Sequence, residues 1–200
     1  VPDDDTTNDN VPDVSSGKVA AAGALMLSGT GDPYSEAKEC AWPLMDFWRE
    51  LWRCGPVMRR IKKEKINYSN DYLARVLKDG GIIEADVIHG ALLMVDVKSF
   101  VAAGGYDENI FLYSEERVLA RRLKAAGFNT VLTPAVYSHG NSETMKRNGL
   151  GLVWRERERL KSEKYYYRTY LKTTKGQQAF TALYQAVVML ETMVGSLFIR

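Results

Sequence analysis

The stretch GGYDENIFLYSEERVLARRLKAAGF, residues 104–128, places two adjacent carboxylates, Glu115 and Glu116, between an apolar-aromatic run and a helical pattern. Apolar side chains recur at helical spacing along one side of that pattern, at Val118, Leu119, Leu123 and Ala126. Gly127 then occupies the position where many helices end on a left-handed residue. The stretch therefore predicts a helix over residues 115–126 whose first turn carries two acids.

The acid pair has a simple interpretation and a functional one. The free N–H groups and the dipole of a helix N-terminus stabilise negative charge, so the pair could serve the helix alone. Adjacent helical residues face in different directions, however, so one acid could brace the structure while the other points into a cleft. A carboxylate that is partly desolvated beside another acid has a raised pKa and makes a better base near neutral pH.

The rest of the chain alternates between short apolar runs and helical patterns, which indicates an α/β fold. Residues 18–27 predict a buried strand, and residues 82–96 predict one or two strands that bend at Gly90. Three further elements are expected: an amphipathic helix over 41–53 after Pro43, a short helix over 97–105 closed by glycine, and a strand over 130–140 broken by Pro134. From residue 141 the pattern is helical to the end.

Composition restricts the classes of protein that fit. A chain of 200 residues with 46% hydrophobic residues suits one domain, or one domain with an appendage. The formal net charge of +2 gives no reason to expect a nucleic-acid partner. Cys40 and Cys54 lack metal-ligand spacing and are interpreted as free thiols in a reducing cytosol. The chain begins with Val in a polar segment and shows no signal peptide, which suggests a fragment.

Carboxylates and one imidazole provide candidate metal ligands. Asp3, Asp4 and Asp5 form a cluster in a polar loop, and His139 follows the last predicted strand. Either feature alone is more often structural or solvated. Together they suit Mg²⁺ or Mn²⁺, since both ions accept oxygen ligands and Mn²⁺ also tolerates imidazole nitrogen. A divalent ion of this kind neutralises a diphosphate.

The stretch GALLMVDVKSFVAAGGYDENIFLYSEERVLARRLKAAGFNTVLTPAVYSHGNS, residues 90–142, resembles the second half of family 2 glycosyltransferases with the GT-A fold. The shared elements are a Gly-Ala pair, a GG-aromatic-DE loop, an aromatic residue before an acid pair, a helix ending in AGF, and a late histidine. The EERVL variant is most similar to bacterial capsular, exopolysaccharide or rhamnosyl-type transferases. The resemblance implies that residues 1–150 form the acceptor-binding and catalytic half, followed by a helical extension over 151–200.

The resemblance also implies chemical roles. Glu116 occupies the position of the catalytic base, and Glu115 would orient it or bind the acceptor. His139 matches a metal ligand of the family. Asp3 and Asp5 lie at about the right distance before residues 18–27 to end the metal- and diphosphate-binding motif. The helix that usually follows this motif is not evident, and the nucleotide-binding strands of the family's first half do not occur in this sequence.

Other matched positions would contact the donor or the acceptor. Gly90 and Ala91 match a small pair that lets a sugar approach the backbone closely. Asp107 and Glu108 match the loop acids, which are better suited to bracing the loop than to chemistry. Val118 departs from the many relatives that carry a further Asp at that position.

These matches predict an inverting glycosyltransferase that moves a sugar from a nucleotide-diphosphate donor to a lipid-linked or glycan acceptor during bacterial surface polysaccharide synthesis. The alternative is a non-catalytic glycan- or lipid-binding module with a degenerate transferase fold. A hydrolase is disfavoured, because adjacent acids cannot lie on both sides of a glycosidic bond.

Two segments suggest a membrane surface as a partner. Residues 41–65 join an aromatic helix to a basic run, which fits either a core-facing helix with a solvated basic face or attachment to the inner membrane surface. Residues 179–200 approach the length of a membrane span. Polar residues interrupt the second segment, so it predicts an amphipathic helix that packs on the domain or lies in the interface rather than a transmembrane helix. We therefore expect a cytoplasmic protein at the inner face of the cell membrane.

Overall fold

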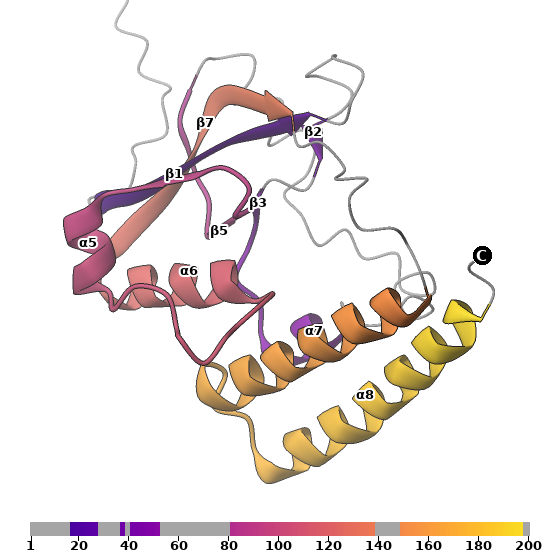
Figure 1. Cartoon of the computed structure of the whole chain (residues 1–200). Helices are drawn as coiled ribbons and strands as arrows, with labels where there is room; N and C mark the ends of the chain where they lie inside the picture. The colour runs from indigo at the N-terminus through magenta and orange to yellow at the C-terminus, as the bar shows by residue number, and fades with distance from the viewer. Residues whose placement is uncertain (1–16, 28–36, 39–40, 53–80, 139–148, 198–200) are drawn as a thin grey trace, which may run out of the picture.

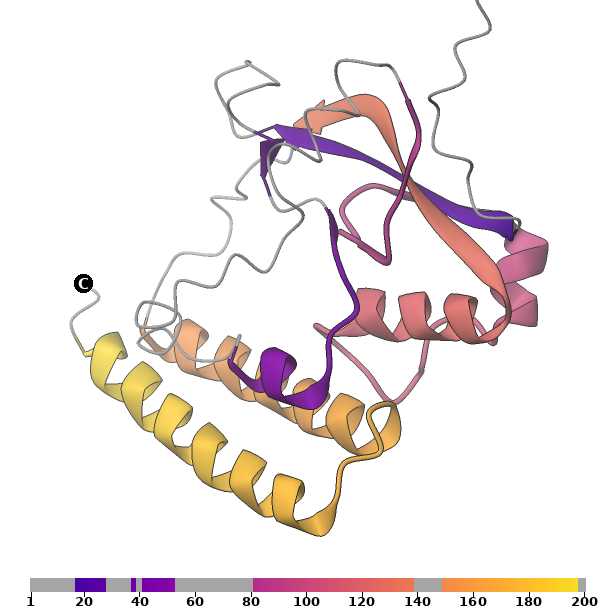
Figure 2. The same cartoon turned by 180° about the vertical axis from the view of Figure 1, so that it is seen from behind.

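The computed structural model describes residues 17–27, 37–38, 41–52, 81–138 and 149–197. A mixed sheet lies above a group of helices, and the front and back views show the same layering (Figures 1 and 2). The architecture is mixed α/β, as the sequence predicts.

The sheet is built on β1 (Lys18–Leu27), the strand expected at this position. On one side β1 pairs in parallel with β7 (Phe128–Ser138), and β7 pairs antiparallel with β4 (Ile83–Glu84). On its other side β1 pairs antiparallel with β2 (Ala37–Lys38) and β6 (Leu93–Val95). A separate two-stranded ladder joins β3 (Ala41–Trp42) to β5 (Val87–Ile88).

Strand β7 passes through Pro134 without ending, which corrects the expectation of a broken strand. The register against β1 shifts here: Gly23 pairs with Leu132, whereas Leu25 pairs with Val136. Proline cannot donate a ladder hydrogen bond and is tolerated at such an irregularity. Gly23 is needed beside it, because a Cβ there would lie 2.2 Å from Cγ2 of Ile88.

Two short helices have local causes in the sequence. Helix α2 (Phe47–Trp52) begins later than expected, because residues 41–42 form β3 and Asp46 accepts a hydrogen bond from the Arg49 N–H. Helix α5 (Val97–Ala102) begins at the N-cap Asp96, whose carboxylate accepts from the Ser99 N–H. The helix is closed by two left-handed glycines with φ of 88° and 59°, at positions 104 and 105.

Helix α6 (Glu115–Ala125) confirms the helix predicted from the opening stretch. Gly127 follows it with φ of 80°, as its place in the sequence predicts. Leu119 and Leu123 pack beneath the sheet with Ala20 and Ala21 of β1. Val118, by contrast, faces the helices and is fully buried.

The helical C-terminal part consists of two helices. Helix α7 (Gly149–Thr169) and α8 (Lys175–Ser196) lie antiparallel along their length (Figure 1). Thr174 starts α8 with a capping box, in which its side chain accepts from the Gln177 N–H. Tyr166 and Tyr167 of α7 are fully buried and pack in the apolar core.

The extension shares its core with the α/β part. One apolar cluster joins α2, α6, α7 and α8, and consists of Phe47, Leu51, Val118, Leu160, Tyr166, Tyr167, Tyr184 and Val188. Within the described ranges, no helix has the length and apolar character needed to cross a membrane.

Candidate functional site: the acid pair at the start of α6

The backbone before the acid pair holds an uncommon conformation. Tyr113 and Ser114 have φ of 65° and 69°, in the left-handed region that residues with side chains rarely adopt. Ser114 is buried, and its hydroxyl accepts a hydrogen bond of 2.6 Å from Nη2 of Arg117. Strained turns of this kind persist only where surrounding contacts hold them, and they concentrate at functional sites.

Glu116 reaches the Gly90 segment that the sequence also singles out. Its Oε1 accepts a hydrogen bond of 3.2 Å from the Gly90 N–H, across 26 positions of sequence. A Cβ on residue 90 would lie 2.9 Å from that same oxygen, closer than real contacts allow. The structure therefore brings Gly90 and the second acid together, and a larger residue at position 90 would displace the carboxylate of Glu116.

Glu115 lies in a more enclosed environment. Burial raises the pKa of its carboxyl group, and the neighbouring charge of Glu116 raises that pKa further. Its Oε2 is buried and has no hydrogen-bond partner among the residues that the structure describes. The two acids thus differ. The enclosed site of Glu115 disfavours its ionised form, whereas Glu116 is held by the backbone N–H of Gly90.

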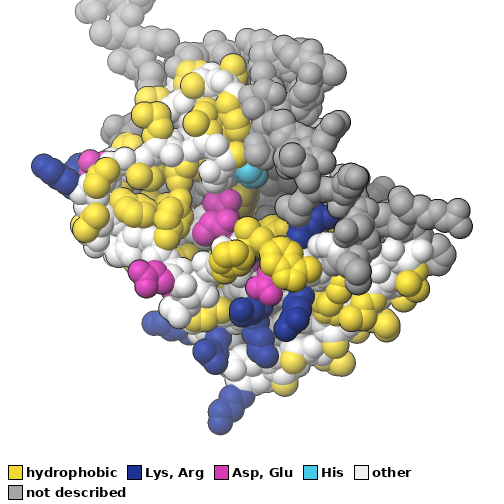
Figure 3. Space-filling model, in the orientation of Figure 1, with side chains coloured by type: hydrophobic (Ala, Val, Ile, Leu, Met, Phe, Trp, Pro, Cys, Tyr) yellow, Lys and Arg dark blue, Asp and Glu magenta, His cyan; other side chains and the backbone are white. Residues whose placement is uncertain are grey.

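Tyr106 lies near the pair and His89 directly precedes Gly90, and neither was predicted as a site residue. Burial, followed by the charges of Glu116 and Glu115, raises the pKa of Tyr106. Nδ1 of His89 accepts a hydrogen bond of 3.1 Å from the Ala91 N–H, and its ring meets the edge of Trp42. Their sequence positions could have indicated them, because His89 precedes the Gly90-Ala91 pair and Tyr106 follows Gly104 and Gly105. Figure 3 shows acidic side chains and a histidine at a hollow between the sheet and the helices.

The loop acids take different positions. Asp107 is buried, and its carboxylate accepts hydrogen bonds from Tyr170, Tyr165 and Asn109. Burial alone would raise the pKa of Asp107, but these hydrogen bonds lower it to about 2. Asp107 is thereby engaged in linking its loop to α7, whereas Glu108 and Ala91 are exposed.

Helix α6 is anchored by a buried ion network. Nη1 of Arg117 lies 2.7 Å from a carboxylate oxygen of Glu50 on α2, and Nη2 lies 3.6 Å from Glu163 on α7. Burial disfavours the charge on Arg117, but Glu50 and Glu163 outweigh burial and raise the pKa above its usual range. The same guanidinium holds Ser114, so this network fixes the turn that presents the acid pair.

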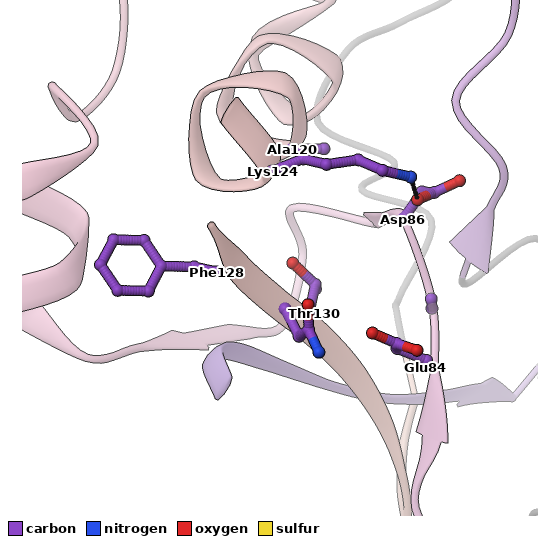
Figure 4. A pocket seen from close by; sticks show the side chains of 8 residues that line it. Glu84, Asp86, Ala120, Lys124, Phe128 and Thr130 are labelled. Atoms are coloured by element: carbon purple, nitrogen blue, oxygen red, sulfur yellow. Dashed lines mark hydrogen bonds and ion pairs between the residues drawn. The ribbon is translucent and has the colours of Figure 1, made fainter. Parts of the chain in front are cut away.

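A pocket of about 450 Å³ opens at the other end of α6 (Figure 4). Lys124 reaches across it to Asp86, with Nζ 2.7 Å from the carboxylate, and Glu84, Phe128 and Thr130 line its walls. Lys124 lies eight residues after Glu116, or roughly 12 Å along the helix axis. Because Lys124 of this pocket is already paired with Asp86, we place the candidate chemistry at the acid pair.

The predicted metal ligands Asp3, Asp5 and His139 all lie outside the described residues. In the described ranges, no three His, Cys, Asp or Glu side chains are grouped to hold a metal ion. The donor set expected from the sequence, hard carboxylate oxygens with one imidazole, has chemistry suited to Mn²⁺ or Mg²⁺. The metal site stays a prediction.

No family model, curated protein or solved structure matches this chain. The assignment of function therefore depends on the residues and on their geometry.

Replacing Glu115 with Gln is expected to stabilise the protein at neutral pH. The folded state raises the pKa of this carboxyl group, so it binds the proton more tightly than the unfolded chain does. Above the folded pKa the ionised form costs stability, and this cost disappears as the pH falls and the group is protonated. A neutral amide removes the cost at all pH values.

Thermal unfolding from pH 5 to pH 8 measures this effect. In a chain of this size, each kcal/mol of added stability raises the melting temperature by about 2–4 °C. The gain over wild type should grow with pH. Glu108→Gln, at an exposed carboxylate, is the matched control and should change little. A melting temperature lowered by Glu115→Gln at pH 8 would show that the ionised form is stabilising.

Proposed function

We propose that this chain is the catalytic part of an inverting glycosyltransferase that takes a sugar from a nucleotide-diphosphate donor. One observation carries the proposal: a strained, braced turn presents two acids, and the backbone of Gly90 holds the second of them. An acid pair that served only as first-turn decoration would need neither the strained turn nor the tertiary contact.

In the proposed reaction, Glu116 accepts the proton of the acceptor hydroxyl. The acceptor oxygen attacks the anomeric carbon from the face opposite the departing nucleoside diphosphate, so a single displacement inverts the configuration. Mn²⁺ or Mg²⁺, held by Asp3, Asp5 and His139, would neutralise the charge of the diphosphate. Glu115 orients Glu116 or binds the acceptor, and its enclosed carboxyl group keeps a second full charge disfavoured beside the base.

The Gly90 and Ala91 segment forms the proposed approach for the sugar. Both residues are exposed and small, so a ligand can come close to their backbone. The exposed Glu108 remains a candidate for acceptor contact, while Asp107 holds its loop in place. We propose a lipid-linked or glycan acceptor in bacterial surface polysaccharide synthesis, and a location at the cytoplasmic face of the cell membrane.

Release of nucleoside diphosphate tests the proposal. The chain, and any longer protein that contains it, is incubated with Mn²⁺, a panel of nucleotide sugars and a lipid-linked acceptor. We expect one donor to support acceptor-dependent release. If glycan or lipid binds while no donor is consumed, the chain acts as a binding module instead.

Gly90→Ala is expected to lower transfer by about 10–100-fold while changing stability little, because misplacing a catalytic group by about 1 Å costs activity of this order. The new Cβ would lie 2.9 Å from Oε1 of Glu116, and the end of that flexible side chain can move away. Steady-state rates and melting temperature are measured together. Gly81→Ala is the matched control, since nothing lies within 4 Å of a Cβ there. Equal activity of both variants would separate Gly90 from the chemistry.

A further inference from the structure

Helix α8 presents an apolar face to solvent. From residue 179 to 197, the exposed side chains lie on one side of the helix and are all apolar: Ala179, Phe180, Ala182, Leu183, Ala186, Val187, Leu190, Met193, Val194 and Leu197. Leu183 and Leu190 are 66% and 63% exposed. At 1.5 Å and about 100° per residue, this face is about 27 Å long and about 160° wide. Figures 1 and 2 both show α8 at the far side of α7 from the sheet.

The polar side chains of α8 point the other way, which reverses the usual pattern of a surface helix. Thr181 and Thr192 are buried, and their hydroxyls donate to carbonyl groups one turn earlier in α8. Gln185 donates to the Leu160 carbonyl of α7 at 2.9 Å. The hydroxyls of Thr181 and Thr192 and the amide of Gln185 are thus satisfied within the protein, whereas Oε2 of Glu191 is buried without a hydrogen-bond partner among the described residues. The outward face carries no polar side chain that water could hydrogen-bond.

Positive charge lies along one border of this apolar face. The exposed charged residues of α7, α8 and the connecting turn in the described ranges are Arg157, Lys161, Lys164, Arg168, Lys172 and Lys175, with no exposed acid among them. Lys161, Lys164 and Arg168 line a groove against α8, where Thr181 and Gln178 form the other wall. Figure 3 shows basic side chains gathered at the lower part of the helical layer, next to apolar side chains along its lower right edge.

An exposed tryptophan lies along the other border. Trp48 of α2 is 47% exposed, and its ring meets the edge of Phe180 with centroids 5.6 Å apart. Tryptophan is favoured at the boundary between water and the acyl region of a membrane. The surface therefore has an apolar centre, a basic border and an aromatic border.

This combination decides between the two occupants that could cover the face. A second copy packed on α8 as a coiled coil would use a narrower seam with opposite charges beside it. A wide face without charges, next to a border that is wholly basic, complements an anionic lipid surface, whereas a second copy would bring the same positive charge.

We propose that the outward face of α8 docks into the interface of an anionic phospholipid bilayer, with Lys164 and Arg168 against the headgroups. The helix lies in the plane of the membrane and does not cross it. This inference deepens the membrane location proposed above, but it does not depend on sugar transfer, because vesicle binding is measured without a donor.

The test is co-sedimentation of the 200-residue chain with vesicles of phosphatidylglycerol and phosphatidylcholine, compared with vesicles of phosphatidylcholine alone. We expect binding to the anionic vesicles that weakens as salt shortens the screening length. Leu183→Asp with Leu190→Asp should weaken binding by about tenfold or more, because apolar burial is lost. Lys164→Glu with Arg168→Glu should weaken it by about thirtyfold or more.

The matched control is Val97→Asp with Val101→Asp on α5, where both side chains are 68% exposed. This pair should bind vesicles as wild type does, and circular dichroism should show that all variants stay folded. The proposal fails if wild type ignores anionic vesicles, or if the control pair loses binding equally. It also fails if sedimentation velocity shows a dimer that the Leu183 and Leu190 pair splits, since a second copy would then cover the face.

Discussion

Glu116→Gln is expected to lower sugar transfer by about 10²–10⁴-fold, the range that a positioned general base contributes. The amide has nearly the same size, and its oxygen can still accept the hydrogen bond from the Gly90 N–H. It cannot take the proton of an acceptor hydroxyl near neutral pH. The loss should therefore appear in kcat with little change in KM for the donor. Nucleoside diphosphate release and product formation measure both quantities.

Two controls separate chemistry from folding in this experiment. The melting temperature of Glu116→Gln should stay close to that of wild type. Glu84→Gln removes an exposed carboxylate of β4, outside the acid-pair site, and should retain most activity. If Glu116→Gln turns over as fast as wild type, Glu116 is not the base and the acid pair serves only the helix.

Arg117→Met is expected to lower the free energy of unfolding by about 3–5 kcal/mol, the cost of removing one partner of a buried ion pair. Glu50 and Glu163 are almost fully buried, and the guanidinium of Arg117 bridges them. Methionine fills similar space but leaves the charge of Glu50 without its closest cation. Urea unfolding followed by circular dichroism measures the change.

A double-mutant cycle isolates the pair. Glu50→Leu with Arg117→Met should regain much of the stability lost in Arg117→Met, because no unpaired charge remains between α2 and α6. Arg157→Met, at an exposed arginine of α7, should change stability by less than about 0.5 kcal/mol. If Arg117→Met alone lowers the free energy of unfolding by no more than Arg157→Met does, the network has no structural role.

The network also connects stability to the site. Arg117 donates to Ser114, and Ser114 precedes the acid pair in a left-handed conformation. Loss of the guanidinium should therefore relax the turn and misplace Glu116. We expect Arg117→Met to lose activity at temperatures where it is still folded, and Glu50→Leu with Arg117→Met to recover stability without full activity.

Local patterns in the sequence were enough for the elements that depend on near neighbours. The strand at 18–27, the short helix closed by glycine and helix α6 with Gly127 were all predicted, and the structure confirms them. Periodicity, caps and left-handed glycines act within a few residues, so they can be read from the chain. The adjacent acids and their place at a helix start belong to the same class of local information.

Contacts between distant segments required the tertiary structure. Neither the hydrogen bond from the Gly90 N–H to Glu116 nor the pairing of Arg117 with Glu50 is visible in sequence spacing. The pairing of β7 with β1 decided that Pro134 is an irregularity inside one strand.

The orientation of α8 was also a tertiary result. Its apolar spacing predicts an amphipathic helix, but spacing cannot say which face meets the protein. The packing of α7 buries Thr181 and Thr192 and leaves Leu183 and Leu190 outside. The sequence by itself determined the helices, the main strands and the acid pair, because these depend on local geometry. Only the fold decided which acid is held, what braces it and which surface is left for a partner, because those depend on segments that meet only when the chain is packed.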